Sequence, residues 1–133
     1  MEKYRVAILQ RVIPSYRQFL FDGISNLSAI ELKVFFGSDI PKTKIKSNFN
    51  KNKKFKSIKL KTSIIKIFKK QFLWHHNLFN SLKQFCPHLI ITEGESNILS
   101  YIQALFYKLV NKETKIIHWS LGGLPKKNNS FIL

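Results

Sequence analysis

The sequence contains a single cysteine and no long apolar run. Cys86 alone excludes an intrachain disulfide and fits a reducing cytoplasm, and we predict a buried, inert thiol, because free cysteines are among the most buried residues. No apolar stretch approaches the roughly 18 residues that a membrane-spanning helix needs. Residues 1–5 lead straight into strand-like sequence, without the pattern of a signal peptide. These absences predict one cytoplasmic domain over residues 1–133.

Glycine is also scarce, and the glycine-rich phosphate loops are missing. The five glycines form neither G-x-G-x-x-G nor G-x-x-x-x-G-K-[ST], motifs in which glycine lets the backbone approach a phosphate. His75 and His76 would point about 100° apart on a helix, and with Cys86 and His88 they lack the paired spacing of a zinc site. We therefore expect no P-loop hydrolase, no Rossmann dinucleotide site, no metal site and no cofactor held by this chain.

Acidic residues are few beside the basic ones. Twenty-three lysines and arginines against seven acidic residues give a formal net charge of +16, a balance typical of proteins that bind polyanions. Only three of the basic residues are arginine, the residue preferred for bidentate phosphate contacts, and no RNA-binding module signature is present. The lysine excess also fits codon usage in an AT-rich genome. The charge favours an anionic surface as partner and argues against sequence-specific nucleic-acid binding.

The first third of the chain predicts a strand, a helix and a second strand. Residues 4–10 form a nearly continuous apolar run, which suits a strand buried on both faces. Residues 15–18 have the S-x-x-Q form of a capping box, so a helix is expected to begin near Tyr16. Residues 32–36 then read as a second strand, and this order implies a parallel pair.

A second strand-helix-strand pattern follows Pro87. Residues 88–92 are a short apolar run, residues 98–109 carry apolar side chains at helical spacing, and residues 115–119 are another short strand. Ser96 or Asn97 can cap the helix. Two strands joined by a crossover helix form a βαβ unit, which again implies a parallel sheet.

The middle of the chain is strongly basic. Residues 42–70 contain twelve lysines and no acidic residue. Residues 42–54 lack periodicity and are expected to form a mobile basic loop, while residues 55–62 read as an edge strand, where lysine blocks unwanted pairing. The lysines fit either a solvated face over core aromatics or a surface for anionic membrane. The residues proposed for that membrane or anion surface are Lys54, Lys56, Lys66, Lys69 and Lys70.

Apolar spacing after residue 62 predicts helix. Ile64, Phe68 and Phe72 recur every four residues, and a helical pattern then continues from Trp74 to Phe85. Together the elements predict an α/β fold: a Rossmann-like open parallel sheet of about five strands in the order 3-2-1-4-5, with helices on both faces. Since the sheet would end on its last strand, part of one face is expected to lack a covering helix, and the chain looks cut short.

Ligands of open parallel sheets bind beyond the carboxyl ends of the strands. Glu93 ends one predicted strand, where it is either part of a solvated turn or a carboxylate facing a crevice, available as a base or for sugar hydroxyls. His118 in the last strand is either packed within it or directed to the same crevice. Gly122 and Gly123 permit close backbone approach, although a tight turn alone would explain them.

The chain resembles the N-terminal, acceptor-side domain of GT-B glycosyltransferases of the kind that build bacterial surface polysaccharide and lipopolysaccharide. The resemblance is carried by Pro-His-Leu-Ile-Ile-Thr-Glu-Gly at residues 87–94, by Lys-Ile-Ile-His-Trp at residues 115–119, and by residues 5–9 leading to Pro-Ser-Tyr-Arg at residues 14–17. Two features depart from the pattern. No glycine-rich loop follows the first strand, and Leu121 stands where a W-G-H-G-like ending has its histidine.

The resemblance implies a two-domain enzyme whose C-terminal domain, absent here, binds the nucleotide sugar. The chain would then be inactive alone, at the inner face of the plasma membrane, with a glycan or lipid-linked acceptor, an anionic membrane surface and the donor domain, in cis or in trans, as partners. Glu93 and His118 would be catalytic. The acceptor-binding residues would be Pro14, Ser15, Tyr16, Arg17, Gly94, Gly122 and Gly123. The alternative function is a non-catalytic basic α/β module that binds anionic membrane or RNA.

Overall fold

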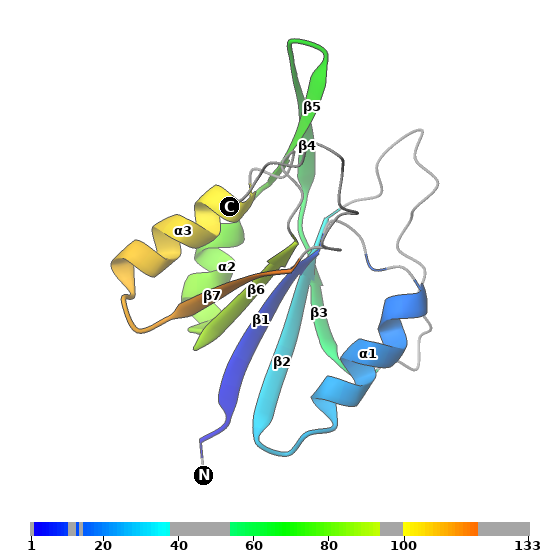
Figure 1. Ribbon diagram of the computed structural model, residues 1–133, viewed down its shortest axis with the longest axis vertical. Coiled ribbons are helices and arrows are strands. Elements are labelled where there is room, and N and C mark those ends of the chain that lie inside the picture. Colours follow the sequence, from blue (N-terminus) through cyan, green and yellow to red (C-terminus); the bar gives the residue numbers. More distant parts are fainter. Residues whose placement is uncertain (1, 11–12, 14, 38–53, 94–99, 120–133) are drawn as a thin grey trace, which may run out of the picture.

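The computed structural model describes residues 2–10, 13, 15–37, 54–93 and 100–119, with the side chains of 70, 71, 73, 93, 100, 101 and 119 left out (Figure 1). Its elements are, in chain order, β1 (Tyr4–Gln10), α1 (Ser15–Ser25), β2 (Ile30–Phe36), β3 (Lys56–Lys59), β4 (Thr62–Ile67), β5 (Lys70–His75), α2 (Leu78–Phe85), β6 (Leu89–Glu93), α3 (Ser100–Val110) and β7 (Lys115–Trp119). The predicted mobile loop at residues 42–54 lies outside the described residues except for Lys54.

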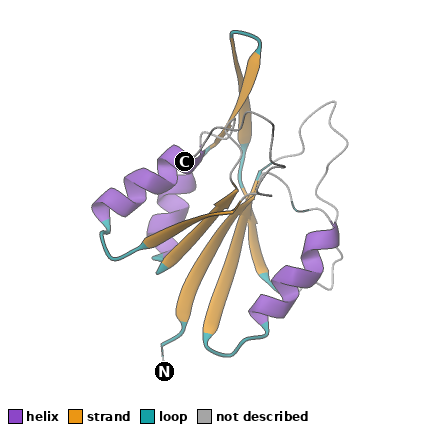
Figure 2. Cartoon of the chain, in the orientation of Figure 1, coloured by secondary structure: helices purple, strands orange, loops and turns teal. Residues whose placement is uncertain are grey.

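Five of the strands form one parallel sheet in the order β3-β2-β1-β6-β7. Numbered along the chain within this sheet, the order is 3-2-1-4-5, as the sequence predicts. The helices lie on both sides of the sheet, with α1 on one and α2 and α3 on the other (Figure 2). The predicted α/β class, with an open parallel sheet of five strands and helices on both faces, is therefore confirmed, and this arrangement is compatible with a Rossmann-like fold.

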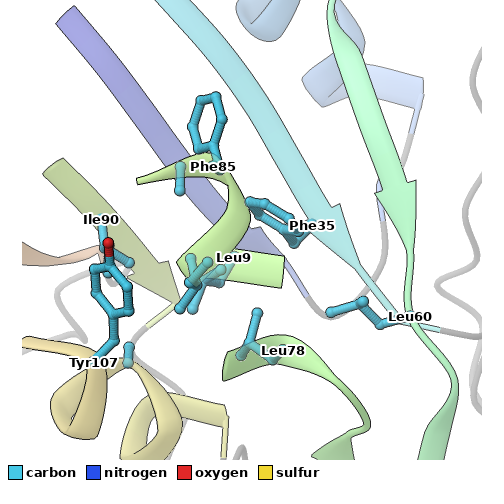
Figure 3. Packing of buried hydrophobic residues seen from close by; sticks show 10 residues of the cluster. Leu9, Phe35, Leu60, Leu78, Phe85, Ile90 and Tyr107 are labelled. Atoms are coloured by element: carbon cyan, nitrogen blue, oxygen red, sulfur yellow. The ribbon is translucent and has the colours of Figure 1, made fainter. Parts of the chain in front are cut away.

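The core has two halves because side chains alternate across a strand. In β1, Val6 and Ile8 face the α1 side, where Phe21 is fully buried, and Ala7 and Leu9 face α2 and α3. Figure 3 shows the second half, in which side chains of three strands meet both helices. Its labelled members are Leu9, Phe35, Leu60, Leu78, Phe85, Ile90 and Tyr107.

Part of the α1 side of the sheet is open among the described residues. Ile117 of β7 is 52% exposed, and Leu89 and Ile91 of β6 are only partly buried. The described helix on this side, α1, packs against β2. Residues 120–133, which follow β7, lie outside the described residues, so the expectation that the sheet lacks a helix over part of one face stays a prediction.

The helix predicted from Ile64 onward is wrong. Residues 62–75 form an antiparallel hairpin, and the helix begins only at Leu78. The four-residue recurrence that suggested a helix also fits a strand, since residues four apart lie on one side of either element. The isoleucines at 64, 65 and 67 then favour the strand, because β-branched side chains suit a pleated surface.

The prediction of a buried Cys86 is also wrong, since the residue is exposed. Cys86 ends α2 in a left-handed conformation, with φ of 53°, and its backbone N–H donates to Leu82 O at 2.8 Å. The chain reverses here and enters β6 after Pro87. A residue that closes a helix in this way lies at the surface whatever its hydropathy.

Candidate functional site at the carboxyl edge of the sheet

The carboxyl end of β1 carries a polar pair. Gln10 is 1% exposed although it follows four apolar residues, and its Nε2 donates to Leu9 O at 3.4 Å. Its Oε1 accepts a hydrogen bond from a guanidinium nitrogen of Arg17, in the first turns of α1. The guanidinium also lies 5.7 Å from the ring centre of Tyr16. The buried amide therefore orients a cation at the edge where parallel sheets bind ligands.

A second polar pair lies on the neighbouring strands. Thr92 of β6 is directly opposite His118 of β7, and Oγ1 lies 2.5 Å from Nδ1. Thr92 is 2% exposed, whereas the His118 imidazole is exposed. A buried hydroxyl bonded to one ring nitrogen fixes the orientation of an imidazole that faces solvent, as general acid–base catalysis requires.

The two pairs flank the topological switch point of the sheet. Leu9 pairs with Thr92, so Gln10 and Thr92 end adjacent strands, β1 and β6. The helix after β1 covers one face of the sheet and the helix after β6 covers the other, and ligands of open α/β sheets bind at the carboxyl edge beside such a point. Arg17 of α1 and His118 of β7, which the sequence analysis singles out, thus both lie at the carboxyl edge of the sheet.

The β4–β5 hairpin leaves the sheet at this edge too. Leu60 N donates to Phe36 O at 2.7 Å where β3 meets the end of β2, and β4 begins two residues later. His75, at the end of β5, is 3% exposed. Its backbone carbonyl accepts from Gln103 Nε2 of α3 at 2.8 Å, so α3 holds the base of the hairpin.

Burial gives His75 an unusually low pKa. Removal of the imidazole from water lowers its pKa to about 4, and the adjacent His76 contributes a smaller lowering. His75 is therefore neutral at pH 7. We interpret it as a packing group at the base of the hairpin, because it is enclosed rather than open to a ligand.

Gly37, which follows β2, is required by this packing. A Cβ atom at position 37 would overlap His75 Nε2 and Thr62 Oγ1. Gly37→Ala is therefore expected to lower the free energy of unfolding by about 1–3 kcal/mol, the usual range for overpacking. Urea denaturation measures it.

Gly23→Ala is the matched control. Nothing lies within 4 Å of a Cβ at Gly23, which is inside α1. There the same substitution is expected to raise the stability by about 0.5–1 kcal/mol, because alanine is the better helix former. Equal effects at the two glycines would contradict the close packing at Gly37.

The structure describes only some of the other predicted site residues. Ser15 and Tyr16 begin α1 and are exposed. Glu93 ends β6 opposite Trp119, and its side chain is outside the described part. The predicted acceptor-binding residues Pro14, Gly94, Gly122 and Gly123 also lie outside the described residues.

The five lysines of the predicted anion surface fall into two groups. Lys54 and Lys56 are exposed just before and at the start of β3, and the Lys54 backbone N–H donates to Asp22 Oδ1 at 2.7 Å. Lys66 and Lys69 are exposed on the hairpin, beyond the end of β3. Lys70 begins β5, and its side chain is outside the described part. In the described part of the chain, these lysines therefore do not form a single basic patch.

The described chain shows neither a metal centre nor a membrane-spanning helix. No group of three or more His, Cys, Asp or Glu side chains is placed there to hold a metal ion. None of the described helices has the length and apolar character needed to cross a membrane.

Sequence reasoning missed the polar partners of this edge. Gln10 and Thr92 were assigned only to strands, and Gln103 only to a helix. Their signal was a polar residue inside or at the end of an apolar run, since a buried polar group needs a partner. The partner of Thr92 is His118, 26 residues away, and the partner of Gln103 is the carbonyl of His75, 28 residues away. Only the folded structure identifies partners so distant in the sequence.

Comparisons with protein-family models, with curated proteins and with solved structures found no match for this chain.

Proposed function

We propose that this chain is the acceptor-side domain of a GT-B glycosyltransferase, which moves a sugar from a nucleotide-sugar donor to a glycan or lipid-linked acceptor. The observation that carries the proposal is the pair of oriented polar groups, Gln10–Arg17 and Thr92–His118, at the switch point of an open parallel sheet. Because the sequence lacks both glycine-rich phosphate motifs, this proposal assigns the donor nucleotide to a second domain.

Each group has a role in this proposal. Arg17 offers several N–H donors in a fixed plane, which suit the phosphate or hydroxyl oxygens of an acceptor. His118, oriented by Thr92, is suited to accept the proton of the attacking hydroxyl. Glu93, the last residue of β6, is the second candidate for that base. The donor nucleotide is held by a second Rossmann-like domain.

Acceptor binding tests the proposal directly. Titration of the ¹⁵N-labelled chain with a short-chain polyprenyl diphosphate sugar is expected to shift resonances of Gln10, Arg17, Thr92 and His118. Arg17→Met is expected to weaken binding by about tenfold or more, since a hydrogen bond to a charged group contributes about 1.5–3 kcal/mol. Lys112→Met is the matched control, because Lys112 is an exposed cation between α3 and the start of β7, at the opposite edge.

Two results would contradict the proposal. One is sugar transfer from a nucleotide sugar by this chain without any partner, since the donor site is assigned to another domain. The other is binding of the nucleotide sugar, but of no acceptor, at Arg17 and His118. An antibody against this domain adds an independent check in source cells: a product roughly twice as large as 15.6 kDa is expected if the donor domain is in cis.

A further inference from the structure

The tip of the β4–β5 hairpin exposes an aromatic ring among lysines. The hairpin extends away from the five-stranded sheet, beyond its carboxyl edge (Figure 1). Phe68 at the tip is 94% exposed, and the preceding Ile67 is 47% exposed. Lys66 and Lys69 are exposed beside them. Folding of the chain gains almost nothing from the Phe68 side chain, because it stays in water.

The backbone of the tip makes this choice of residues unfavourable for folding. Ile67 pairs with Lys70, so the loop contains only Phe68 and Lys69, and their φ angles are 49° and 67°. Two-residue loops with positive φ at both positions favour asparagine and glycine, because other side chains crowd the backbone there. An exposed phenylalanine at such a position calls for an explanation outside the folded chain.

One face of the hairpin continues the apolar surface of the tip. Paired residues of an antiparallel ladder point to the same side. The pairs Ser63–Trp74 and Ile65–Phe72, together with Ile67, therefore share one face. Ile65 is 38% exposed, and Trp74 and Phe72 are partly buried. An apolar strip thus leads from the body of the protein to the tip, where lysines border it.

We propose that the β4–β5 hairpin docks on anionic lipid bilayers, with Phe68 and Ile67 in the boundary between headgroups and acyl chains. Lys66 and Lys69 then lie level with the lipid phosphates, where their charged groups meet the anionic headgroups. The proposal stands on the hairpin alone and does not depend on the transferase function.

The observations favour a bilayer over other partners. Isoleucine and phenylalanine gain from transfer into an apolar phase, whereas single-stranded RNA is bound by aromatic faces together with a charged groove. The sequence has no acidic residue between Asp39 and Glu93, so nothing in this stretch repels an anionic surface. Since the hairpin projects from the carboxyl edge of the sheet, docking would turn the Arg17–His118 edge toward the membrane.

Vesicle sedimentation with Phe68→Asn tests the insertion. The full chain is expected to bind phosphatidylcholine vesicles that contain phosphatidylserine and to bind pure phosphatidylcholine weakly. Phe68→Asn should weaken binding by about tenfold or more, the equivalent of one lost phenylalanine burial. The melting temperature should stay unchanged or rise, because asparagine tolerates positive φ. Loss of binding then cannot be attributed to unfolding.

The controls remove equivalent groups elsewhere. Phe19→Ala removes a ring that is 88% exposed on α1 and is expected to leave binding unchanged. Lys66→Gln with Lys69→Gln should weaken binding by about thirtyfold, at roughly 1 kcal/mol per lysine near an anionic surface. Lys83→Gln with Lys112→Gln, two exposed lysines at the other edge, should have a much smaller effect.

Three results would overturn the proposal. Unchanged vesicle binding of both hairpin variants would show that the tip does not insert. Loss of binding only on replacement of Leu105 and Leu109 would assign the membrane contact to the exposed apolar side of α3. Binding of the unmodified chain to a single-stranded RNA but not to anionic vesicles would assign the lysines to nucleic acid instead.

Discussion

Phe35→Ala is expected to lower the free energy of unfolding by about 3–5 kcal/mol, the range measured for large-to-small changes in protein cores. Phe35 lies in β2, between β1 and β3, and is 1% exposed. Its ring meets that of Phe85 edge to face, with centroids 6.2 Å apart, and Leu9 and Leu60 belong to the same cluster (Figure 3). Removal of the ring leaves a cavity that strands on either side cannot close without losing their register.

Phe19→Ala is the matched control for this change. Its ring is 88% exposed on α1, so the substitution should change stability by less than about 0.5 kcal/mol. Chemical denaturation of both variants measures the difference. Similar losses for the two rings would mean that the cluster on the α2 and α3 side does not hold the sheet together. A loss of the expected size is a large share of the total for a domain, which is typically about 5–15 kcal/mol.

The parallel sheet could be predicted because its strands are marked by composition. β1, β6 and β7 are short apolar runs between turn residues, which is typical of strands buried on both faces. Their order followed from the alternation of strands and helices, since crossovers between parallel strands are right-handed and neighbouring. Residues 115–119 were predicted as a strand and are a strand.

The hairpin could not be predicted in the same way. Its residues are partly exposed on both faces, so no strict alternation of apolar and polar residues marks the strands. Its turn also lacks the asparagine and glycine that normally identify a two-residue loop. Phe68 and Lys69 depart from the residue preference of such loops. Departures of this kind are expected at functional or strained sites.

The candidate site was predicted only in part. The general position of ligands in parallel sheets predicts His118 at the carboxyl edge, whereas Arg17 is implied only by the family resemblance at residues 14–17. Gln10 and Thr92, which orient them, are identified only once the strands are adjacent. The enclosed state of His75 depends on a close approach of Gly37, which directly follows β2 and lies 38 positions earlier in the chain. No local pattern encodes such an approach.

Acidification is expected to destabilise the fold through His75. The folded-state pKa of this imidazole is about 4, below its ordinary value of 6.5, because burial disfavours the charged form. Between these two values the unfolded chain binds the proton and the folded chain does not. Stability is therefore full above pH 6.5 and falls as the pH is lowered toward 4. The expected loss from this group is about 3 kcal/mol by pH 4, at about 1.4 kcal/mol for each unit of pKa difference.

The variant His75→Gln separates the contribution of His75 from the destabilisation that acid causes in the whole chain. Acid also protonates the carboxylates of a chain whose formal charge is already +16, so stability should fall in every variant. Glutamine stays neutral, and the pH dependence of its unfolding free energy between pH 7 and 4 should be shallower by about 3 kcal/mol. The same slope in both proteins would contradict an enclosed, neutral His75. A shallower slope would show that the folded chain keeps His75 enclosed and neutral at the base of the hairpin, at a cost in stability that grows as the pH falls.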